Sequence, residues 1–143
     1  MTYLEFTVDG EPVGKGRPRF TRSGHAYTPE KTADYEQFVK VSFRKKYPDF
    51  KPIEKDIPLY AVIEACFKIP KNTGKKAREK MLSGSIRHTK KPDGDNIAKA
   101  VLDALNGLAY HDDSQIFMFT VVKKYSDCPC VKIYIDEWRG ESE

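Results

Sequence analysis

The feature that most constrains the fold of this chain is the segment 95–108, which has the pattern of an amphipathic helix. At 100° per residue, its apolar side chains fall within an arc of about 120°. These are Ile97, Ala98, Val101, Ala104, Leu105 and Leu108. The opposite arc, of about 80°, contains Asp95, Lys99, Asp103 and Asn106. Because such a helix must bury its apolar side against another element, the segment predicts a layered domain with a charged helical face left at the surface.

The rest of the chain supplies elements against which this helix could pack. Strand patterns, alternating or rich in β-branched residues, occur at 3–10, 59–70, 109–126 and 130–138. A second helix is predicted over 28–47, with Thr28 as its N-cap. The order strand, helix, strand, loop, helix, strand, strand predicts an α/β fold. We expect residues 1–143 to form a single domain, with a mixed β-sheet of about four strands and helices packed on it.

Basic residues are concentrated in two parts of the sequence. The segment from Lys68 to Lys91 is rich in Lys and Arg and has Glu79 as its one acid. Its few apolar residues predict a mobile basic loop, with at most a turn or two of helix at 77–82. The stretch GKGRPRFTR, residues 14–22, is basic and has no neighbouring acid. Two basic segments around an acidic centre could bind a polyanion, although lysine-rich loops also serve only to keep proteins soluble.

Other features argue against several classes of protein. The start, MTYLEFTVDG, does not have the pattern of a secretory signal, and the chain has three cysteines, an odd number. No apolar run approaches the roughly 18 residues that cross a bilayer. We therefore expect a reduced, cytoplasmic protein without membrane contact. The stretch VGKGRPR lacks the spacing of a phosphate-binding loop, so no nucleotide cofactor is predicted.

Acidic residues occur on both sides of the helix. Asp93 and Asp95 flank Gly94, where an extended backbone would point both side chains the same way, and Asp112 and Asp113 enter the next predicted strand. On helix evidence alone, ordinary surface salt bridges are the better explanation of the charged face. If the carboxylates converge, however, their repulsion of about 4 kcal/mol per pair at 4 Å requires a cation. Oxygen ligands favour Mg²⁺, Mn²⁺ or Ca²⁺ over zinc, and the spacing does not match a calcium-binding EF-hand loop.

The stretch KKPDGDNIAKAVLDALNGLAYHDDSQI, residues 90–116, resembles the signature of the RusA-type Holliday junction resolvase family. The N-terminal GKGRPRFTRSGHAYTP is similar to the version in the Gram-positive and phage branch of that family. The resemblance implies a small dimeric α/β endonuclease that cuts four-way DNA junctions with Mg²⁺ or Mn²⁺. Position by position, it implies Asp93, Asp95 and Asp113 as metal ligands and Lys99 as the catalytic lysine. Gly94 departs from the family, which often has a larger apolar residue there.

The chemistry of phosphodiester hydrolysis gives each of these residues a role. Metal ions bind a non-bridging phosphate oxygen and lower the pKa of bound water, and Lys99 would stabilise charge developing on the phosphate. Asp103 and Asp112 are possible supports for the metal ligands. Asp103 could pair with Lys99, support a metal ligand or take a direct catalytic part, and we expect Asp112 to point to the other side of its strand.

The predicted function is therefore that of a crossover junction endodeoxyribonuclease in DNA recombination and repair, with branched DNA as its partner. A less selective flap nuclease and a non-catalytic DNA-binding module with a structural cation are the alternatives. The two-fold symmetry of a junction predicts a homodimer.

Phe20 and Tyr27 either pack in the core or stack on unpaired bases. Candidate phosphate contacts are Lys15, Arg17, Arg19, Lys75, Lys76, Lys90 and Lys91.

Overall fold

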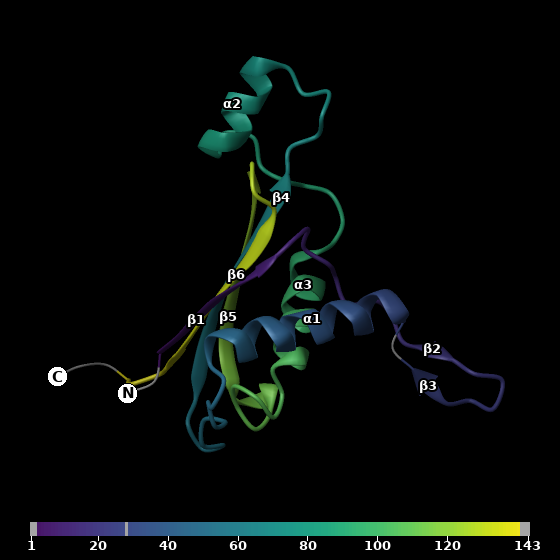
Figure 1. Cartoon of the computed structure of the whole chain (residues 1–143), viewed down its shortest axis with the longest axis vertical. Helices are drawn as coiled ribbons and strands as arrows, with labels where there is room; N and C mark the ends of the chain where they lie inside the picture. Colours follow the sequence, from purple (N-terminus) through teal and green to yellow (C-terminus); the bar gives the residue numbers. More distant parts are fainter. Residues whose placement is uncertain (1–2, 28, 141–143) are drawn as a thin grey trace.

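A computed structural model describes residues 3–27 and 29–140 of the chain. Four strands form its main sheet, in the order β1-β6-β4-β5 (Figure 1). Their bounds are β1 (Tyr3–Asp9), β4 (Leu59–Lys68), β5 (Ile116–Ser126) and β6 (Cys130–Glu137). β6 pairs antiparallel with both β1 and β4, whereas β4 and β5 are parallel. The predicted mixed sheet of four strands is thus confirmed, and β4 lies between the two strands that follow each other at the C-terminal end.

Alternation along the strands explains which face of the sheet is covered. In β1 the side chains of Leu4, Phe6 and Val8 are buried and their neighbours are exposed. Ile63 and Ala65 of β4 are buried on the same side of the sheet. Since successive side chains of a strand point to opposite faces, this pattern gives the sheet one apolar face on which helices can pack.

Two helices cover that face. They are α1 (Glu30–Lys46) and α3 (Gly94–Ala104), which lie together on one side of the sheet in Figure 1. Val39 and Phe43 of α1 and Ile97 and Val101 of α3 are fully buried in the shared core. Each large apolar side chain that is buried contributes about 1.5–3 kcal/mol. The predicted cap Thr28 lies outside the described residues, and the N-cap of α1 is Pro29.

The connection between the parallel strands β4 and β5 contains α2 (Lys75–Ser83) and α3. α2 buries none of its nine residues and projects beyond the ends of β4 and β5 (Figure 1). An ion pair between Arg78 and Asp127 ties it to the turn after β5. The segment predicted to be a loop therefore contains a helix longer than the turn or two expected.

The predicted strand 109–126 begins later than expected, at Ile116. A short 3₁₀ helix, η1 (Asp113–Gln115), precedes it. The backbone N–H of Ser114 donates to the Asp112 carboxylate at 3.1 Å, and that of Asp112 donates to the Gln115 side chain at 3.2 Å. These local bonds compete with strand pairing. Consequently, Asp112 and Asp113 lie in a turn and do not alternate along a strand.

A small second sheet stands apart from the domain body. β2 (Arg19–Phe20) and β3 (Ala26–Tyr27) form an antiparallel hairpin that projects past the end of α1 (Figure 1). The sequence pattern does not distinguish these two-residue strands from the basic stretch around them. Among the described residues, no helix has the length and apolar character that crossing a membrane requires.

Candidate active site

The charged face of α3, η1 and the start of β5 enclose a cavity of about 280 Å³, which we call the acid cavity. It brings together Asp95, Lys99 and Asp113, three of the four residues predicted to be catalytic. Its remaining lining residues are Asn96, Ala98, Leu102, Ile116 and Phe119. Helix periodicity places Asp95 and Lys99 one turn apart on the same face, and the crossover from α3 back to β5 brings Asp113 to them.

Asp113 lies close to a second carboxylate. Its backbone N–H donates to Asn106 Oδ1 at 2.7 Å, which fixes the start of η1. Burial, a hydrogen bond with Asp103, and the nearby charges of Asp103 and Asp112 raise the pKa of Asp113. The folded protein therefore keeps negative charge here that is not fully neutralised, and this charge favours the binding of a cation.

Lys15 places a positive charge beside the Asp103 carboxylate and partly neutralises it. Its Nζ lies 3.2 Å from an Asp103 oxygen and 3.2 Å from a Glu36 oxygen, and the lysine side chain is only 17% exposed. Burial alone lowers the pKa of Lys15, but the hydrogen bonds with Asp103 and Glu36 outweigh burial and raise it. This side chain points into the protein and binds two carboxylates, whereas its predicted role from the sequence is a phosphate contact. Glu36 was missed because no motif links it to the acidic segment.

Asp93 lies outside the acid cavity. It is the N-cap of α3 with an extended backbone, whereas Gly94 and Asp95 are already helical, so the alternation expected of an extended pair does not apply. The Asp93 carboxylate is about half exposed and lies 3.5 Å from Lys91 Nζ. Asp112 is also outside the cavity, where hydrogen bonds from the Ser114 side chain and backbone lower its pKa.

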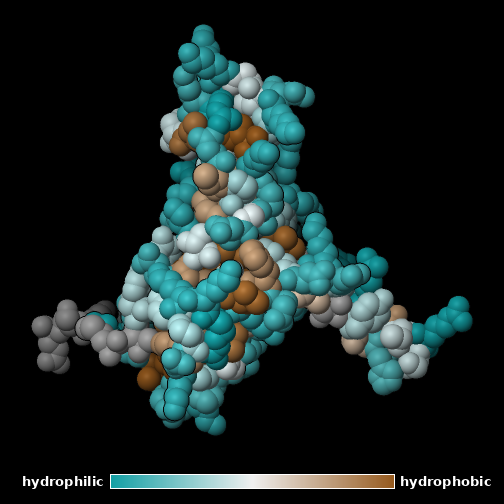
Figure 2. Space-filling view, in the orientation of Figure 1, coloured by the Kyte–Doolittle hydropathy of each residue, from teal (hydrophilic) through white to brown (hydrophobic). Residues whose placement is uncertain are grey.

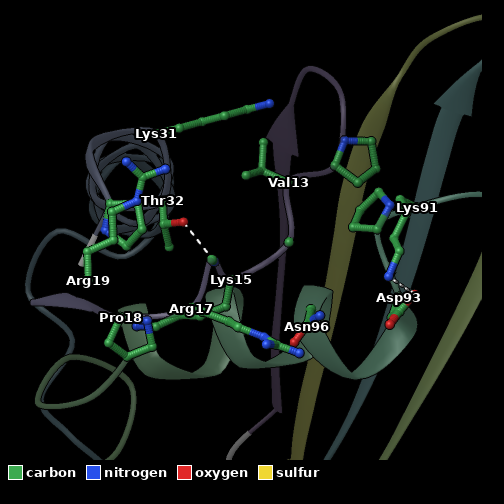
Figure 3. A pocket seen from close by; sticks show the side chains of 15 residues that line it. Val13, Lys15, Arg17, Pro18, Arg19, Lys31, Thr32, Lys91, Asp93 and Asn96 are labelled. Carbon is green, nitrogen blue, oxygen red and sulfur yellow. Dashed lines mark hydrogen bonds and ion pairs between the residues drawn. The ribbon is translucent and has the colours of Figure 1, made fainter. Parts of the chain in front are cut away.

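Beside the acid cavity lies a larger groove of about 670 Å³, which we call the basic groove. Figure 3 looks into it, with the Lys91 side chain directed toward Asp93 and the Thr32 hydroxyl toward the N-terminal arm, residues 12–18. Its basic lining residues are Lys15, Arg17, Arg19, Lys31 and Lys91. Asn96 lines both the groove and the acid cavity, so the two are adjacent.

The N-terminal arm is fastened to both helices by its backbone. The N–H of Lys15 donates to the Asn96 carbonyl at 2.9 Å, and that of Gly16 donates to Thr32 Oγ1 at 2.9 Å. A Cβ at Gly14 would lie 2.6 Å from Cβ of Pro92, so only glycine fits there. By contrast, a Cβ at Gly94 would make ordinary contacts at 3.6 Å with Val121. A side chain at this position, as is common in the family, would therefore start without a steric conflict.

The other predicted phosphate contacts lie in two exposed segments, and one of them, Lys91, also lines the basic groove. Lys75 and Lys76 are exposed in the first turn of α2, and Lys90 and Lys91 are exposed just before α3. The segment 84–93 packs on β4 through His88, whose ring stacks on Phe67 at a centroid distance of 3.6 Å. Burial and the charges of Lys123 and Lys90 lower the pKa of His88.

The donor set matches a hard divalent cation in chemistry, but its carboxylates line one cavity without forming a group of three around one point. Among residues 3–27 and 29–140, no three His, Cys, Asp or Glu side chains lie close enough together to hold a metal ion. Asp95 and Asp103 are eight residues apart on α3, which is about 12 Å along the helix axis. Asp113, which lies close to Asp103, therefore lines the end of the cavity that is away from Asp95. All these donors are carboxylate oxygens, which suit Mg²⁺ or Mn²⁺.

An acid cavity with a lysine, next to a groove lined by arginines, is typical of a nuclease. A model of the protein family described as "Endodeoxyribonuclease RusA" matches residues 9–136. The chain belongs to the RusA endodeoxyribonuclease family, which confirms the resemblance found in the sequence. It is also similar to "Uncharacterized protein YqaN" from Bacillus subtilis (strain 168), with 39% identity over 145 residues that cover 96% of this chain and 98% of that protein.

Proposed function

We propose that this protein is a crossover junction endodeoxyribonuclease, which resolves four-way DNA junctions by paired hydrolysis of phosphodiesters with Mg²⁺ or Mn²⁺. One observation carries the proposal: Asp95, Lys99 and Asp113 line one cavity, next to a groove lined by Arg17 and Arg19. Membership of an endodeoxyribonuclease family supports the same reaction class.

The carboxylates would supply the oxygen ligands. Asp113 would contribute from η1 with Asp103 behind it, and Asp95 from the first turn of α3. Within residues 3–27 and 29–140, the Asp93 carboxylate forms one ion pair, the exposed pair with Lys91, and such surface pairs contribute less than about 1 kcal/mol. Asp93 could therefore leave this pair and join the other ligands. When bound, the divalent cation polarises a phosphoryl oxygen and lowers the pKa of a water molecule.

Lys99 would act on the phosphate itself. Its side chain is exposed on the same helical face as Asp95 and lines the acid cavity. A lysine ammonium is a compact charge on a flexible stem, so it can follow the negative charge that develops on the phosphate in the transition state.

Basic residues on both sides of the acid cavity would hold the DNA backbone against it. Arg17 and Arg19 would bind phosphates in the basic groove, and α2 would do so through Lys75 and Lys76. Lys90 and Lys91 would bridge the two. Lys15 has a different role in this proposal: it would set the charge and position of Asp103, because its ammonium group is already bonded to two carboxylates.

The proposal includes a homodimer, because resolving a junction takes two opposed cuts. Exposed apolar side chains at the edge strand β5 support it. Phe117, Met118 and Trp138 are 52%, 47% and 46% exposed, and the Phe117 and Trp138 rings contact each other at 5.3 Å between centroids. An apolar cluster of this kind on a chain of this size is typical of a protein interface.

The test is a cleavage assay with labelled synthetic DNA: a four-way junction, a flap and a linear duplex, each with Mg²⁺, with Mn²⁺ and with a chelator. We expect paired nicks in the junction with either metal and none with the chelator. Equal cutting of the flap would favour the less selective nuclease. Junction binding without cutting in both metals would favour the DNA-binding module and contradict the proposal.

A further inference from the structure

The hairpin, residues 19–27, is held together by backbone pairing but has no core of its own. Arg19 pairs with Tyr27, and Phe20 pairs with Ala26. The tip is closed by a bond of 2.9 Å from Thr21 N to the His25 carbonyl, and by Gly24, whose φ of +86° favours glycine. Every residue from 19 to 27 is exposed. In Figure 2 the hairpin stands out from the body as a narrow projection.

Phe20 decides between the two roles that the sequence left open. At 69% exposure it is the most exposed of the large hydrophobic side chains in the described part of the chain, so it does not pack in the core. Burying such a side chain would contribute about 1.5–3 kcal/mol. The isolated chain gains little of this stabilisation, so the ring is free to contact a partner.

Charge around the ring indicates what this partner is. Residues 12–27 include Arg17, Arg19 and Arg22 and contain no Asp or Glu. Two copies of the hairpin would therefore repel each other, which argues against self-association at this surface. A flat aromatic ring among cations is suited to a nucleobase with its flanking phosphates, because every base has a face on which an aromatic ring can stack.

The base of the hairpin is fixed relative to the acid cavity. The backbone N–H groups of Lys15 and Gly16 donate to Asn96 of α3 and to Thr32 of α1, and Asn96 lines the acid cavity. From Gly16 to Phe20 the chain can extend about 13 Å. A base held by Phe20 would thus lie at a set distance from the phosphate held beside Lys99. In an intact duplex the bases are stacked inside, whereas the branch point of a junction can expose them.

We propose that the hairpin selects branched DNA by stacking Phe20 on an unpaired base at the branch point, while Arg19 and Arg22 hold the flanking phosphates. This inference rests on the proposed function, since it names the feature of the junction that the protein would recognise. Phe20 would be a specificity residue and would not take part in hydrolysis.

Permanganate oxidation of thymines at the branch point tests the proposal without requiring cleavage, because only unstacked thymines react. The DNA would be a synthetic four-way junction with thymines at the branch point and in mid-arm, and the buffer would contain a chelator. We expect the wild-type protein to increase reactivity at the branch point only, Phe20→Ala to lose the increase, and Phe20→Tyr to keep it. Phe38→Ala, which removes another exposed ring from α1, should behave as wild type.

Cutting rates in Mg²⁺ provide the second readout. Loss of one stacked base predicts that Phe20→Ala slows junction cutting by about ten-fold or more, with Phe20→Tyr within about two-fold of wild type. Melting curves would show that each variant is folded. Wild-type reactivity and cutting in Phe20→Ala would overturn the proposal, as would the absence of junction binding by the wild type. Reactivity that depends on Phe20 in a protein that does not cut would support the hairpin role and contradict the proposed nuclease function.

Discussion

At the scale of single residues, the pair formed by Asp113 and Asp103 has the clearest physical consequence. A carboxyl whose pKa is raised on folding favours the folded state below its unfolded pKa, and this contribution is lost as the pH rises through the folded pKa. The pKa of Asp113 is raised from the ordinary value of 3.8. At neutral pH, repulsion between the two ionised carboxylates therefore destabilises the metal-free protein. A bound cation would remove this repulsion.

Asp113→Asn should stabilise the metal-free protein, because it removes one of the two repelling charges and nearly keeps the shape. We expect a gain on the order of 1 kcal/mol, which is a few degrees in Tm. Mg²⁺ should raise the Tm of the wild type and not that of the variant. Thermal melts at neutral pH, with a chelator and then with Mg²⁺, would measure both effects.

Asp112→Asn is the matched control. Its carboxylate accepts a hydrogen bond from Ser114 that lowers its pKa, so neutralising it should bring no gain in Tm. If Asp113→Asn melted below the wild type, or responded to Mg²⁺ as strongly, Asp113 would not be part of a cation site.

The positions of these residues could be predicted from the sequence where neighbouring residues determine them, and not where distant parts of the chain do. Asp95 and Lys99 share a face because helix periodicity puts them there, and the sequence contains that periodicity. The direction of Asp93 depends on where extended backbone changes to helix, and the helix starts at Gly94, one residue earlier than the pattern implied. The partners of Lys15 come from other parts of the chain, so its inward orientation has no local signal.

At the scale of elements, the stacking of His88 on Phe67 holds the segment 84–93 that leads into α3. The ring also lies near Tyr125, and Lys123 donates to the Lys90 carbonyl beside it at 2.6 Å. A histidine whose pKa is lowered on folding stabilises the protein above its unfolded pKa, and this stabilisation is lost as the pH falls. The loss should therefore begin below the ordinary value of 6.5.

His88→Phe should keep the stacking and remove this part of the pH dependence. The substitution breaks no hydrogen bond of His88 Nδ1, since that buried atom has no partner among the described residues. His88→Ala should cost about 1–2 kcal/mol at pH 7.5, from lost stacking and burial. Urea unfolding between pH 7.5 and 5.5 would compare the variants. A pH dependence that is equal in wild type and His88→Phe would show that other groups cause it.

The elements themselves were predictable where a long pattern repeats. β1, β4 and both packing helices follow from alternation or periodicity over at least two turns or several strand residues. The late start of β5 comes from two hydrogen bonds in the Asp112–Gln115 capping box, which compete with strand propensity. The hairpin has strands of two residues each, too short to give a period.

At the scale of the whole molecule, the proposed dimer should depend on the apolar cluster at β5. Met118 pairs in register with Tyr60, whose side chain alternates with the core residues of β4, so Met118 lies on the sheet face away from α1 and α3. Met118→Lys should leave the fold intact, because the side chain is exposed. It should also convert a dimer of two 16.4 kDa chains into a monomer.

Light scattering during size-exclusion chromatography would measure the mass of each variant. Val41→Lys is the control, since Val41 is 41% exposed on α1, away from the cluster. A wild-type protein that stays monomeric at every concentration, or a Met118→Lys protein that stays dimeric, would contradict this choice of interface.

The most direct test of the account is the single-turnover rate of junction cutting in Asp95→Asn, beside wild type and Asp49→Asn, which neutralises an exposed aspartate after α1. If Asp95 supplies an oxygen ligand in the acid cavity, its variant should cut at least a hundred-fold more slowly while its affinity for the junction is kept, and Asp49→Asn should cut as wild type. Cutting by Asp95→Asn at the wild-type rate would contradict the assignment of the acid cavity as the active site.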